Sequence, residues 1–361
     1  MYKEFFDSMN SFVDKLQDEE SVRIFEARFK YFIDKDIDSL EDSLVKEAEK
    51  YRNSCRSWIL EAFYKKYPDK KSKSIAVFGA GVFGRSSIRS LKTLDIEVEV
   101  VIDNNFEKII EVEGIKVLSP EILKKEKDKY IVIVAVANLE WQMSIYYQLT
   151  EMGISADNIL LTKSGSIWCD YGNQYFDLNK LPINPEGEIF VDAGCFDGMS
   201  SVNAKKWAGN ALLKIYAFEP DKNNFEICKD CLQSIGCEFE VFNEATWSSK
   251  RQLTFEINAF GHASKITKEG NEIVNTNSLD NVLDGRPVTY IKLDVEGSEL
   301  ETLKGAVESI KRYRPKLAIS LYHKPEDIVE IPVFIESLGM DYKYYIRHYQ
   351  TRWCETTLYA F

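Results

Sequence analysis

Two acids and a histidine follow neighbouring apolar segments in the C-terminal half of the chain. Asp294 and Glu296 come after the segment Thr289–Leu293, and His323 follows the segment Lys316–Leu321. Both segments are typical of buried parallel strands, whose carboxyl ends meet at the edge of an open α/β sheet where ligands bind. A histidine whose pKa is near neutral can remove the proton of a hydroxyl group. We therefore expect an active site here, with His323 as the general base and Asp294 and Glu296 beside it.

Other roles are open to the same residues. Asp294, Glu296 and His323 could hold a divalent cation, although Mg²⁺ prefers oxygen ligands and the mixed set makes a metal the less favoured interpretation. Glu299 could instead stabilise the N-terminus of the following helix. His348 is expected on a C-terminal hairpin near the same edge, where it could assist the reaction or bind substrate. Metal dependence therefore stays open.

A turn with the pattern D-x-G-x-x-x-G indicates a cofactor site. Asp192, Gly194 and Gly198 form this pattern after one strand-like segment, and Glu219 closes the next. Backbone N–H groups in such a turn can bind a carboxylate, and an acid at the second strand can accept hydrogen bonds from both ribose hydroxyls. With few glycines and an acidic start, the turn suits a ligand with an ammonium group and no pyrophosphate. S-adenosylmethionine has this chemistry.

An earlier turn has the glycine spacing of a dinucleotide-binding motif. Gly79, Gly81 and Gly84 lie between a strand-like and a helix-like segment, and Asp103 ends the next strand-like segment. Glycines at these positions let the backbone approach a pyrophosphate, and Asp103 could accept a hydrogen bond from a ribose. No pair of hydride-transfer residues is evident nearby. This turn therefore predicts either a second nucleotide site or a domain that has lost that function.

The elements that must position these turns divide the chain into four predicted parts. Residues 1–72 have an apolar face at helical spacing and predict a helical segment. Residues 73–163 alternate strand-like and helix-like segments and predict a Rossmann-like accessory domain. Residues 164–187 are rich in turn-forming residues and predict a linker. Residues 188–361 repeat the alternation, so the predicted fold class is α/β with two Rossmann-like, doubly wound domains.

The expected strands and the best-defined helices follow from the same hydrophobic patterns. The strands are predicted at Ile75–Phe78, Val98–Ile102, Tyr130–Val136, Glu188–Val191, Lys214–Phe218, Glu238–Phe242, Thr289–Leu293 and Lys316–Leu321, with a closing hairpin at Tyr342–His348 and Glu355–Phe361. Helices are predicted at Val82–Leu94 and Glu140–Met152.

Charge and hydropathy limit the classes of partner. The 361 residues include 46 Lys and Arg against 58 Asp and Glu, a net charge of −12 that opposes binding to the phosphate backbone of nucleic acids. The longest apolar run, Ile131–Ala137, is far shorter than the roughly 20 residues of a membrane helix. The N-terminus lacks the apolar stretch of a signal peptide, and the odd number of cysteines argues against a secreted disulfide framework. We expect a cytoplasmic protein without a membrane span or a nucleic-acid partner.

Four sequence blocks occur in the order found in one enzyme family. VDAGCFDG, FEP, IKLDVEGSE and PKLAISLYH resemble the FkbM-type methyltransferases, over residues 186–361. The resemblance implies a seven-stranded methyltransferase fold with S-adenosylmethionine as cofactor. For cofactor binding it implies Asp192, Gly194 and Gly198 at the methionine end, Glu219 at the ribose, and Glu244 and Ala245 at the adenine. Cys195 and Phe196, in the same turn as Gly194, are further predicted cofactor-binding residues. Residues 74–163 also resemble Rossmann domains of the nucleotide-sugar type.

One function is predicted, with two alternatives. The prediction is an S-adenosylmethionine-dependent O-methyltransferase, and the resemblance implies an acceptor that is a sugar, a nucleotide sugar, a glycolipid or another small molecule. The first alternative is an NAD-dependent oxidoreductase or epimerase that uses residues 74–163. The second is a non-catalytic nucleotide sensor. The N-terminal helices could form a homodimer. The acceptor, the methylated position and the oligomeric state stay open.

Overall fold

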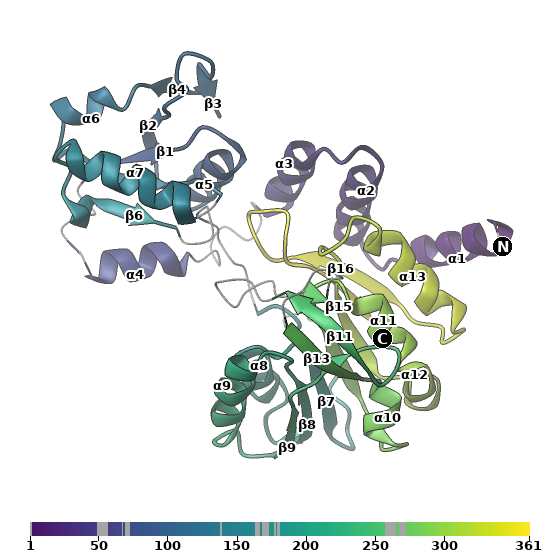
Figure 1. Cartoon of the computed structure of the whole chain (residues 1–361). Coiled ribbons are helices and arrows are strands. Elements are labelled where there is room, and N and C mark those ends of the chain that lie inside the picture. Colours follow the sequence, from purple (N-terminus) through teal and green to yellow (C-terminus); the bar gives the residue numbers. More distant parts are fainter. Residues whose placement is uncertain are drawn as a thin grey trace. The chain divides into compact units, whose positions relative to one another are not determined.

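The computed structural model divides the chain into two compact units, each built from segments that are not contiguous in sequence (Figure 1). Unit 1 contains Met1–Lys35, Asn173–His348 and Cys354–Phe361, and unit 2 contains Asp36–Gly172 and Tyr349–Trp353. The residues that the structure describes are 2–48, 57–66, 68, 73–137, 139–162, 167, 173–176, 178, 181–256, 265–266 and 272–361. The first 72 residues, grouped above as one helical segment, are thus divided between the units.

Unit 2 is built on a six-stranded sheet with the order β3-β4-β2-β1-β5-β6, in which all pairs except β3–β4 are parallel. Its strands are β1 (Ser74–Phe78), β2 (Val98–Ile102), β3 (Glu111–Val112), β4 (Ile115–Leu118), β5 (Tyr130–Val134) and β6 (Ile159–Leu161). The helices are α3 (Ile37–Ala48), α4 (Trp58–Lys66), α5 (Val82–Thr93), α6 (Glu121–Lys125) and α7 (Leu139–Glu151).

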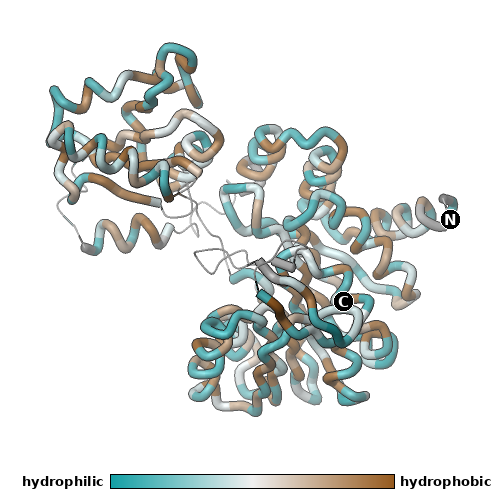
Figure 2. Tube along the Cα trace, in the orientation of Figure 1, coloured by the Kyte–Doolittle hydropathy of each residue, from teal (hydrophilic) through white to brown (hydrophobic). Residues whose placement is uncertain are grey.

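The sheet of unit 2 is covered on both faces, because successive side chains of a strand point to opposite sides. Ile75 and Val77 of β1 pack in one core with residues of α4 and α5. Ala76 and Phe78 pack in a second core with residues of α6 and α7. The central strands are accordingly hydrophobic along most of their length (Figure 2). This arrangement is the doubly wound α/β architecture that the alternating pattern predicts.

Unit 1 contains a seven-stranded sheet with the order β16-β17-β15-β14-β7-β8-β9. Its strands are β7 (Glu188–Ala193), β8 (Leu212–Phe218), β9 (Glu238–Phe242), β14 (Tyr290–Leu293), β15 (Lys316–Ser320), β16 (Tyr344–His348) and β17 (Thr356–Ala360). Strand β17 runs antiparallel to both of its neighbours, and the other pairs are parallel. The α/β fold class, the seven strands and the closing hairpin are therefore confirmed.

The order of the strands fixes where a ligand can enter unit 1. From β7 the chain adds β8 and β9 on one side, and later β14 and β15 on the other. The order of the strands therefore changes direction between β7 and β14, and in open α/β sheets ligands are expected at the carboxyl ends of two such strands. The helices that flank the sheet are α8 (Met199–Ala208), α9 (Lys222–Leu232), α10 (Leu279–Leu283), α11 (Glu299–Lys304), α12 (Val307–Tyr313) and α13 (Asp327–Ser337).

Two N-terminal helices belong to unit 1. Helices α1 (Tyr2–Asp14) and α2 (Glu19–Asp34) pack against α13 and β16, and they bury Phe12, Ile24 and Phe25. Their apolar faces are thus used within unit 1, and the homodimer through the N-terminal helices stays a prediction. None of the helices in the described ranges is both long enough and apolar enough to cross a membrane.

A second sheet of unit 1 was not predicted. It has four strands in the order β10-β13-β11-β12. The strands are β10 (Ala245–Thr246), β11 (Arg251–Glu256), β12 (Lys265–Ile266) and β13 (Glu272–Asn277). Two of these strands have only two residues, and β13 alternates polar residues with few apolar ones, so hydrophobic periodicity gives no clear signal in this segment.

Candidate active site

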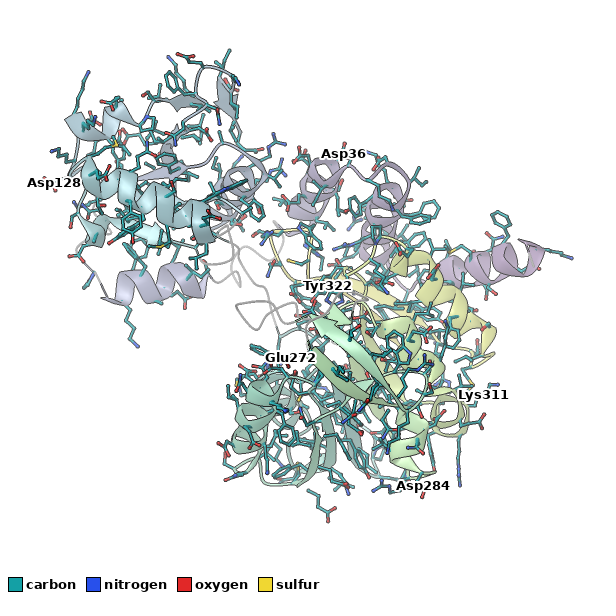
Figure 3. All side chains as sticks on the ribbon, in the orientation of Figure 1. Asp36, Asp128, Glu272, Asp284, Lys311 and Tyr322 are labelled. Atoms are coloured by element: carbon teal, nitrogen blue, oxygen red, sulfur yellow. The ribbon has the colours of Figure 1, made fainter. Side chains whose placement is uncertain are left out.

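The acids and the histidine expected at the edge of the sheet lie together in unit 1. The Nε2 atom of His323 is 3.6 Å from Oδ1 of Asp294 and 3.3 Å from Oε2 of Glu296. Its Nδ1 atom is 2.8 Å from Oε1 of Glu299. Tyr322, the residue before His323, lies just beyond the end of β15 (Figure 3). The structure therefore brings Asp294, Glu296 and His323 into one cluster and adds Glu299 to it.

The turn between β14 and α11 holds this cluster in place. Glu296 and Gly297 both have positive φ angles, 53° and 90°. Residues other than glycine seldom adopt a positive φ, so the turn holds the backbone of Glu296 in an unusual conformation. Glu299 Oε1 accepts hydrogen bonds from the N–H groups of Val295 (3.0 Å) and Gly297 (3.4 Å). Glu299 is fully buried, and it both caps the turn and orients His323.

The charges of the cluster act strongly on one another. Burial lowers the pKa of His323, but Glu299, Asp294 and Glu296 outweigh burial and raise it to about 10. Burial raises the pKa of Asp294, but the charges of Lys292 and His323 outweigh it, so that this pKa lies below its ordinary value. The imidazole is therefore protonated at neutral pH within this cluster. A role as general base requires that part of the surrounding negative charge be neutralised.

Two tyrosines that the sequence did not point to complete the cluster. The hydroxyl of Tyr175 donates to Oδ2 of Asp294 (3.0 Å), and the hydroxyl of Tyr322 donates to Oδ1 (3.1 Å). Tyr322 also donates to Glu355 (3.3 Å). Tyr175 lies in the segment predicted as a linker, where no pattern distinguishes it. Tyr322 is next to His323, so its position after an apolar strand was the one available signal.

The turn after β7 lies against the turn after β14. Gly194 has a φ of 75°, and a Cβ atom there would overlap the carbonyl oxygen of Asp294. The N–H groups of Gly194 and Cys195 donate to the carbonyl oxygen of Phe218, at 3.0 and 3.1 Å. These two donors, expected to face a cofactor carboxylate, are thus used within the protein. Gly194 is required where it stands because the two turns approach too closely for a side chain.

Asp192, the first residue of the D-x-G-x-x-x-G pattern, has internal partners. Its Oδ2 atom accepts from the hydroxyls of Ser200 and Ser201, both at 2.6 Å, and its Oδ1 atom is 3.1 Å from Nζ of Lys292. Lys292 also donates to the carbonyl oxygen of Gly194 (2.6 Å). Both members of the ion pair are buried. A lysine inside the apolar strand YIKL was the missed signal, since a buried ammonium group requires an acidic partner.

Glu219, predicted to bind a ribose, follows β8 and accepts one backbone hydrogen bond on each carboxylate oxygen. Its Oε1 atom accepts from the N–H of Asp221 (2.9 Å), and its Oε2 atom accepts from the N–H of Phe196 (3.0 Å). Each carboxylate oxygen has a second lone pair that a ligand hydroxyl can use. Burial raises the pKa of Glu219 to about 7, although the two N–H groups oppose the shift. Glu219 therefore titrates near neutral pH in the absence of a ligand.

The remaining residues of the predicted cofactor site follow the same turns. The Sγ atom of Cys195 contacts Sγ of Cys228 at 3.1 Å, and Cys195 is buried. Gly198 has a φ of 84° and starts α8. Glu244 accepts a hydrogen bond from Asn277 (2.9 Å). Ala245, in β10, is buried. Their contacts with a cofactor stay a prediction.

His348 has a different environment from His323. It ends β16, and its Nδ1 atom is 2.9 Å from Oγ1 of Thr356, which also accepts from Nε of Arg28 (2.9 Å). His348 is buried. Its described hydrogen bond thus belongs to the network between α2 and the hairpin, and its catalytic role stays a prediction. The third histidine, His262, lies outside the described residues.

In unit 2 the turn after β1 has the geometry that its glycines suggest. Gly79 has a φ of 122°, and a Cβ atom at Gly84 would overlap the carbonyl oxygen of Gly79. Gly81 faces open space. Asp103 accepts hydrogen bonds from the N–H groups of Ala80 and Asn105, both at 2.7 Å. Asp103 therefore braces the turn itself, and nucleotide binding by these four residues stays a prediction.

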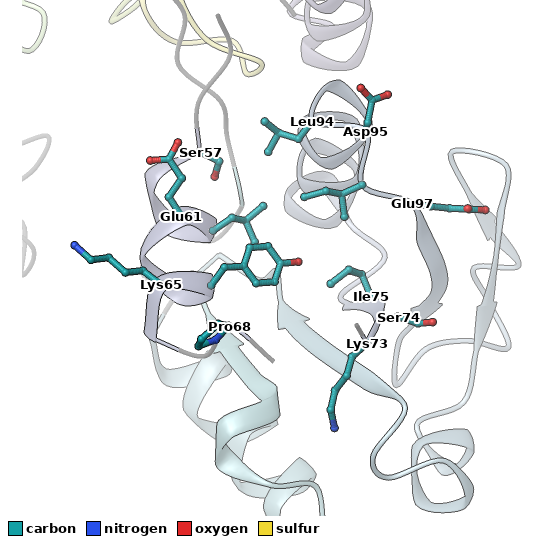
Figure 4. A pocket seen from close by; sticks show the side chains of 13 residues that line it. Ser57, Glu61, Lys65, Pro68, Lys73, Ser74, Ile75, Leu94, Asp95 and Glu97 are labelled. Carbon is teal, nitrogen blue, oxygen red and sulfur yellow. The ribbon is translucent and has the colours of Figure 1, made fainter. Parts of the chain in front are cut away.

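Unit 2 also has a pocket with a volume of about 780 Å³. It is lined by Leu60 and Tyr64 of α4, by Ser74 and Ile75, and by the segment Leu94–Glu97 (Figure 4). Ser74 and Ile75 begin β1, so the pocket lies at the amino ends of the strands. Ligands of open α/β sheets bind at the carboxyl ends. The pocket is therefore separate from the turn that carries Gly79, Gly81 and Gly84.

Two parts of the chain match known domain families. Residues 192–344 match the methyltransferase FkbM domain, and residues 71–160 match the domain described as C2185-like, N-terminal. The first match spans β8, β9, β14 and β15 together with the turns that carry Glu219, Asp294 and His323. No curated protein is significantly similar to the chain.

Solved structures show similarity at low identity. The methyltransferase FkbM from Methylobacillus flagellatus KT is 18% identical with a TM-score of 0.47, over 84% of this chain and 93% of that one. An S-adenosylmethionine-dependent methyltransferase from Aquifex aeolicus is 18% identical with a TM-score of 0.29, over 48% and 82%. Fibrillarin from Aeropyrum pernix, in complex with S-adenosylmethionine, is 11% identical with a TM-score of 0.33, over 55% and 90%. The match at residues 192–344 thus identifies an FkbM methyltransferase domain in the C-terminal part of this chain.

Proposed function

We propose that unit 1 binds S-adenosylmethionine and transfers its methyl group to a hydroxyl oxygen of an acceptor. The observation that supports this most directly is that two kinds of group lie at the carboxyl ends of strands within the family-matched region. Glu219 follows β8 and has the geometry of a ribose-binding acid. Asp294, Glu296 and His323 follow β14 and β15 and form a polar cluster.

The reaction is a displacement at the methyl carbon of the sulfonium. The acceptor oxygen forms the new C–O bond as the C–S bond breaks, and the sulfur keeps the electron pair of the broken bond. The hydroxyl proton has to leave during this step, and the cluster around His323 is the proposed destination. The positive charge of the sulfonium favours loss of the proton that His323 carries in the ligand-free structure, because like charges repel.

The proposed acceptor is a sugar, a nucleotide sugar, a glycolipid or another small molecule with a hydroxyl group. Unit 2 is proposed as an accessory domain that binds the nucleotide or carrier part of this acceptor. Two features support that role. Gly81 leaves open space before the N-terminus of α5, and helix N-termini attract phosphate groups.

The test is calorimetric titration of the full chain with S-adenosylhomocysteine, and separately with NAD and UDP-glucose. The matched variants are Glu219→Gln in unit 1 and Asp103→Asn in unit 2, because both remove one carboxylate charge with little change of shape. Loss of two charge-assisted hydrogen bonds in Glu219→Gln is expected to cost about 3 kcal/mol, or roughly 100-fold in affinity for S-adenosylhomocysteine.

The outcomes separate the proposed function from its rival. Binding of S-adenosylhomocysteine that Glu219→Gln weakens and Asp103→Asn leaves unchanged supports the methyltransferase. Binding of NAD alone, lost in Asp103→Asn, would move the chemistry to unit 2 and favour an oxidoreductase. If none of the three ligands binds the wild-type protein, the proposal fails.

A further inference from the structure

His323 has one ring nitrogen that is fixed and one without a hydrogen-bond partner. Its side chain is only 9% exposed, and Nδ1 is held at 2.8 Å by Glu299. Among the residues that the structure describes, Nε2 has no hydrogen-bond partner. It points between the carboxylates of Asp294 and Glu296, at 3.6 and 3.3 Å. Buried polar atoms usually make a hydrogen bond, whereas this nitrogen has only ion-pair contacts with the two carboxylates, which leaves room for a ligand between them.

Two distances within the cluster, both from Nε2 of His323, resemble those between atoms that share one metal ion. Ligand atoms at about 2.1 Å from a cation lie about 3.0 Å apart in adjacent octahedral positions and about 3.4 Å apart in a tetrahedron. The two distances from Nε2 of His323, 3.3 and 3.6 Å, fall close to these values. Among the described residues, the set whose ligand atoms all lie within 4.8 Å of one another is Asp294, Glu299 and His323. Glu296 joins this set through its contact with Nε2 of His323.

We propose that His323 Nε2, Asp294 Oδ1 and Glu296 Oε2 bind a divalent cation at the edge of the sheet, and that the cation holds the acceptor oxygen. The part played by the cation in catalysis rests on the proposed function, whereas the binding site itself does not. His323 then acts as a ligand rather than as the general base.

The residues around these ligands support the assignment. A histidine that binds a metal usually donates its other ring N–H to a carboxylate, which fixes the tautomer, and ligating carboxylates are themselves hydrogen-bonded. Glu299 meets the first condition at Nδ1 of His323. Tyr175 and Tyr322 meet the second at the two oxygens of Asp294. Glu299 Oε1 already accepts from two backbone N–H groups, so we assign Glu299 as a positioning residue.

The site is open on one side, as a catalytic metal site must be. The side chains of Asp294 and Glu296 are 26% and 35% exposed, whereas His323 and Glu299 are buried. Three protein ligands leave positions for oxygens of the acceptor or of water. A mixed set of two carboxylates and one imidazole suits Mn²⁺, which accepts both ligand types.

The cation gives the hydroxyl proton a route that does not need a strong base. A divalent cation lowers the pKa of an oxygen bound to it by several units. In this form of the mechanism water, rather than the cluster around His323, takes the proton of the acceptor hydroxyl near neutral pH, and the resulting oxygen anion attacks the methyl carbon. The sulfur leaves with its electron pair, and the charges balance as S-adenosylhomocysteine forms.

The test measures Mn²⁺ binding to the full chain by the loss of the free-ion signal in electron paramagnetic resonance, without cofactor or acceptor. We expect one site in the wild-type protein, and at least tenfold weaker binding in Asp294→Asn and His323→Ala. Glu299→Gln, which removes no proposed ligand but disturbs the orientation of His323 and the turn that carries Glu296, is expected to weaken Mn²⁺ binding about 10- to 100-fold. Glu219→Gln is the matched control and should bind Mn²⁺ like the wild type. Circular dichroism and thermal melting show whether each variant is folded.

Two results would overturn the proposal. One is a wild-type protein that binds no Mn²⁺ at millimolar concentration. The other is Mn²⁺ binding that persists unchanged in both Asp294→Asn and His323→Ala, which would place the ion elsewhere. If Mn²⁺ binds as expected but S-adenosylhomocysteine does not bind, the cation site stands and the proposed methyltransferase function falls. If S-adenosylhomocysteine binds but Mn²⁺ does not, the proposed cation site is wrong and the proposed methyltransferase function stands.

Discussion

The first turn of unit 1 and the first turn of unit 2 are built alike but surrounded differently. Each follows a central strand and has a glycine whose Cβ would overlap a backbone carbonyl, at Gly194 and at Gly84. In unit 1 the neighbouring strand ends add the Asp192–Lys292 ion pair and the His323 cluster. In unit 2 Asp103 only braces its own turn. Glycine spacing thus indicates the backbone conformation of a turn. The reaction or binding that the turn can support depends on charged side chains from neighbouring strands.

The largest expected difference concerns Asp192 and Asp103, the acids that stabilise the two turns. Asp192→Asn leaves the ammonium group of Lys292 buried without its counter-ion, and should lower the free energy of unfolding of unit 1 by about 3–5 kcal/mol. Asp103→Asn weakens two hydrogen bonds of a partly exposed acid, and should cost unit 2 only about 1 kcal/mol. Urea denaturation followed by hydrogen exchange measures each unit separately. Equal losses of unfolding free energy in the two variants would contradict this prediction and show that the two acids stabilise their turns to the same extent.

A smaller effect separates two glycines within unit 2. Gly84→Ala places a methyl group against the carbonyl of Gly79 and should destabilise unit 2 by about 2 kcal/mol or more. Gly81 has an ordinary φ of −84° and open space in front of it, so Gly81→Ala should change stability by less than about 0.5 kcal/mol. Thermal melting of both variants tests this. A large loss in Gly81→Ala would mean that the turn is packed more closely than the structure has it.

The smallest effect is a pH dependence that only the unit 1 turn should have. The pKa of Glu219 is raised to about 7 by burial, and its protonated form cannot accept hydrogen bonds from two ribose hydroxyls at once. Affinity for S-adenosylhomocysteine should therefore fall as the pH drops below 7, by up to about tenfold per unit. Calorimetry at pH 6 and 8 measures the change. In Glu219→Gln the affinity should be low and nearly independent of pH, and a wild-type profile equally flat would contradict the assignment.

Most of the fold could be predicted from the sequence because parallel strands are buried on both faces. Such strands are continuous apolar runs, as in β5 (YIVIV) and β8 (LLKIYAF), and each precedes a helix. The second sheet of unit 1 could not be predicted because β11 and β13 are largely polar. These two strands pair with each other although they are separated in sequence by more than ten residues. The division of the N-terminal helices between the units could not be predicted either. Hydrophobic periodicity shows that a helix has a buried face but not which part of the chain covers that face.

The acids and the histidine of the site could be predicted from topology alone. Asp294 and His323 end adjacent parallel strands, and adjacent strand ends meet. Tyr175 could not be predicted, since it reaches Asp294 from a segment far away in sequence. The protonation of His323 could not be predicted either, because it depends on three carboxylates whose distances only the folded chain defines.

The discontinuous make-up of the two units constrains how this protein can be inherited and engineered. Unit 2 contains Tyr349–Trp353, a short strap from the far end of the chain. Within unit 2 the strap's Thr351 hydroxyl is hydrogen-bonded to that of Ser90, and the guanidinium of Arg352 lies over the ring of Phe83 at 5.5 Å. A gene fragment that stops at residue 172 therefore encodes an incomplete accessory domain. Recombination between relatives has to transfer Tyr349–Trp353 together with the rest of unit 2. The two units are therefore expected to be inherited together rather than exchanged separately.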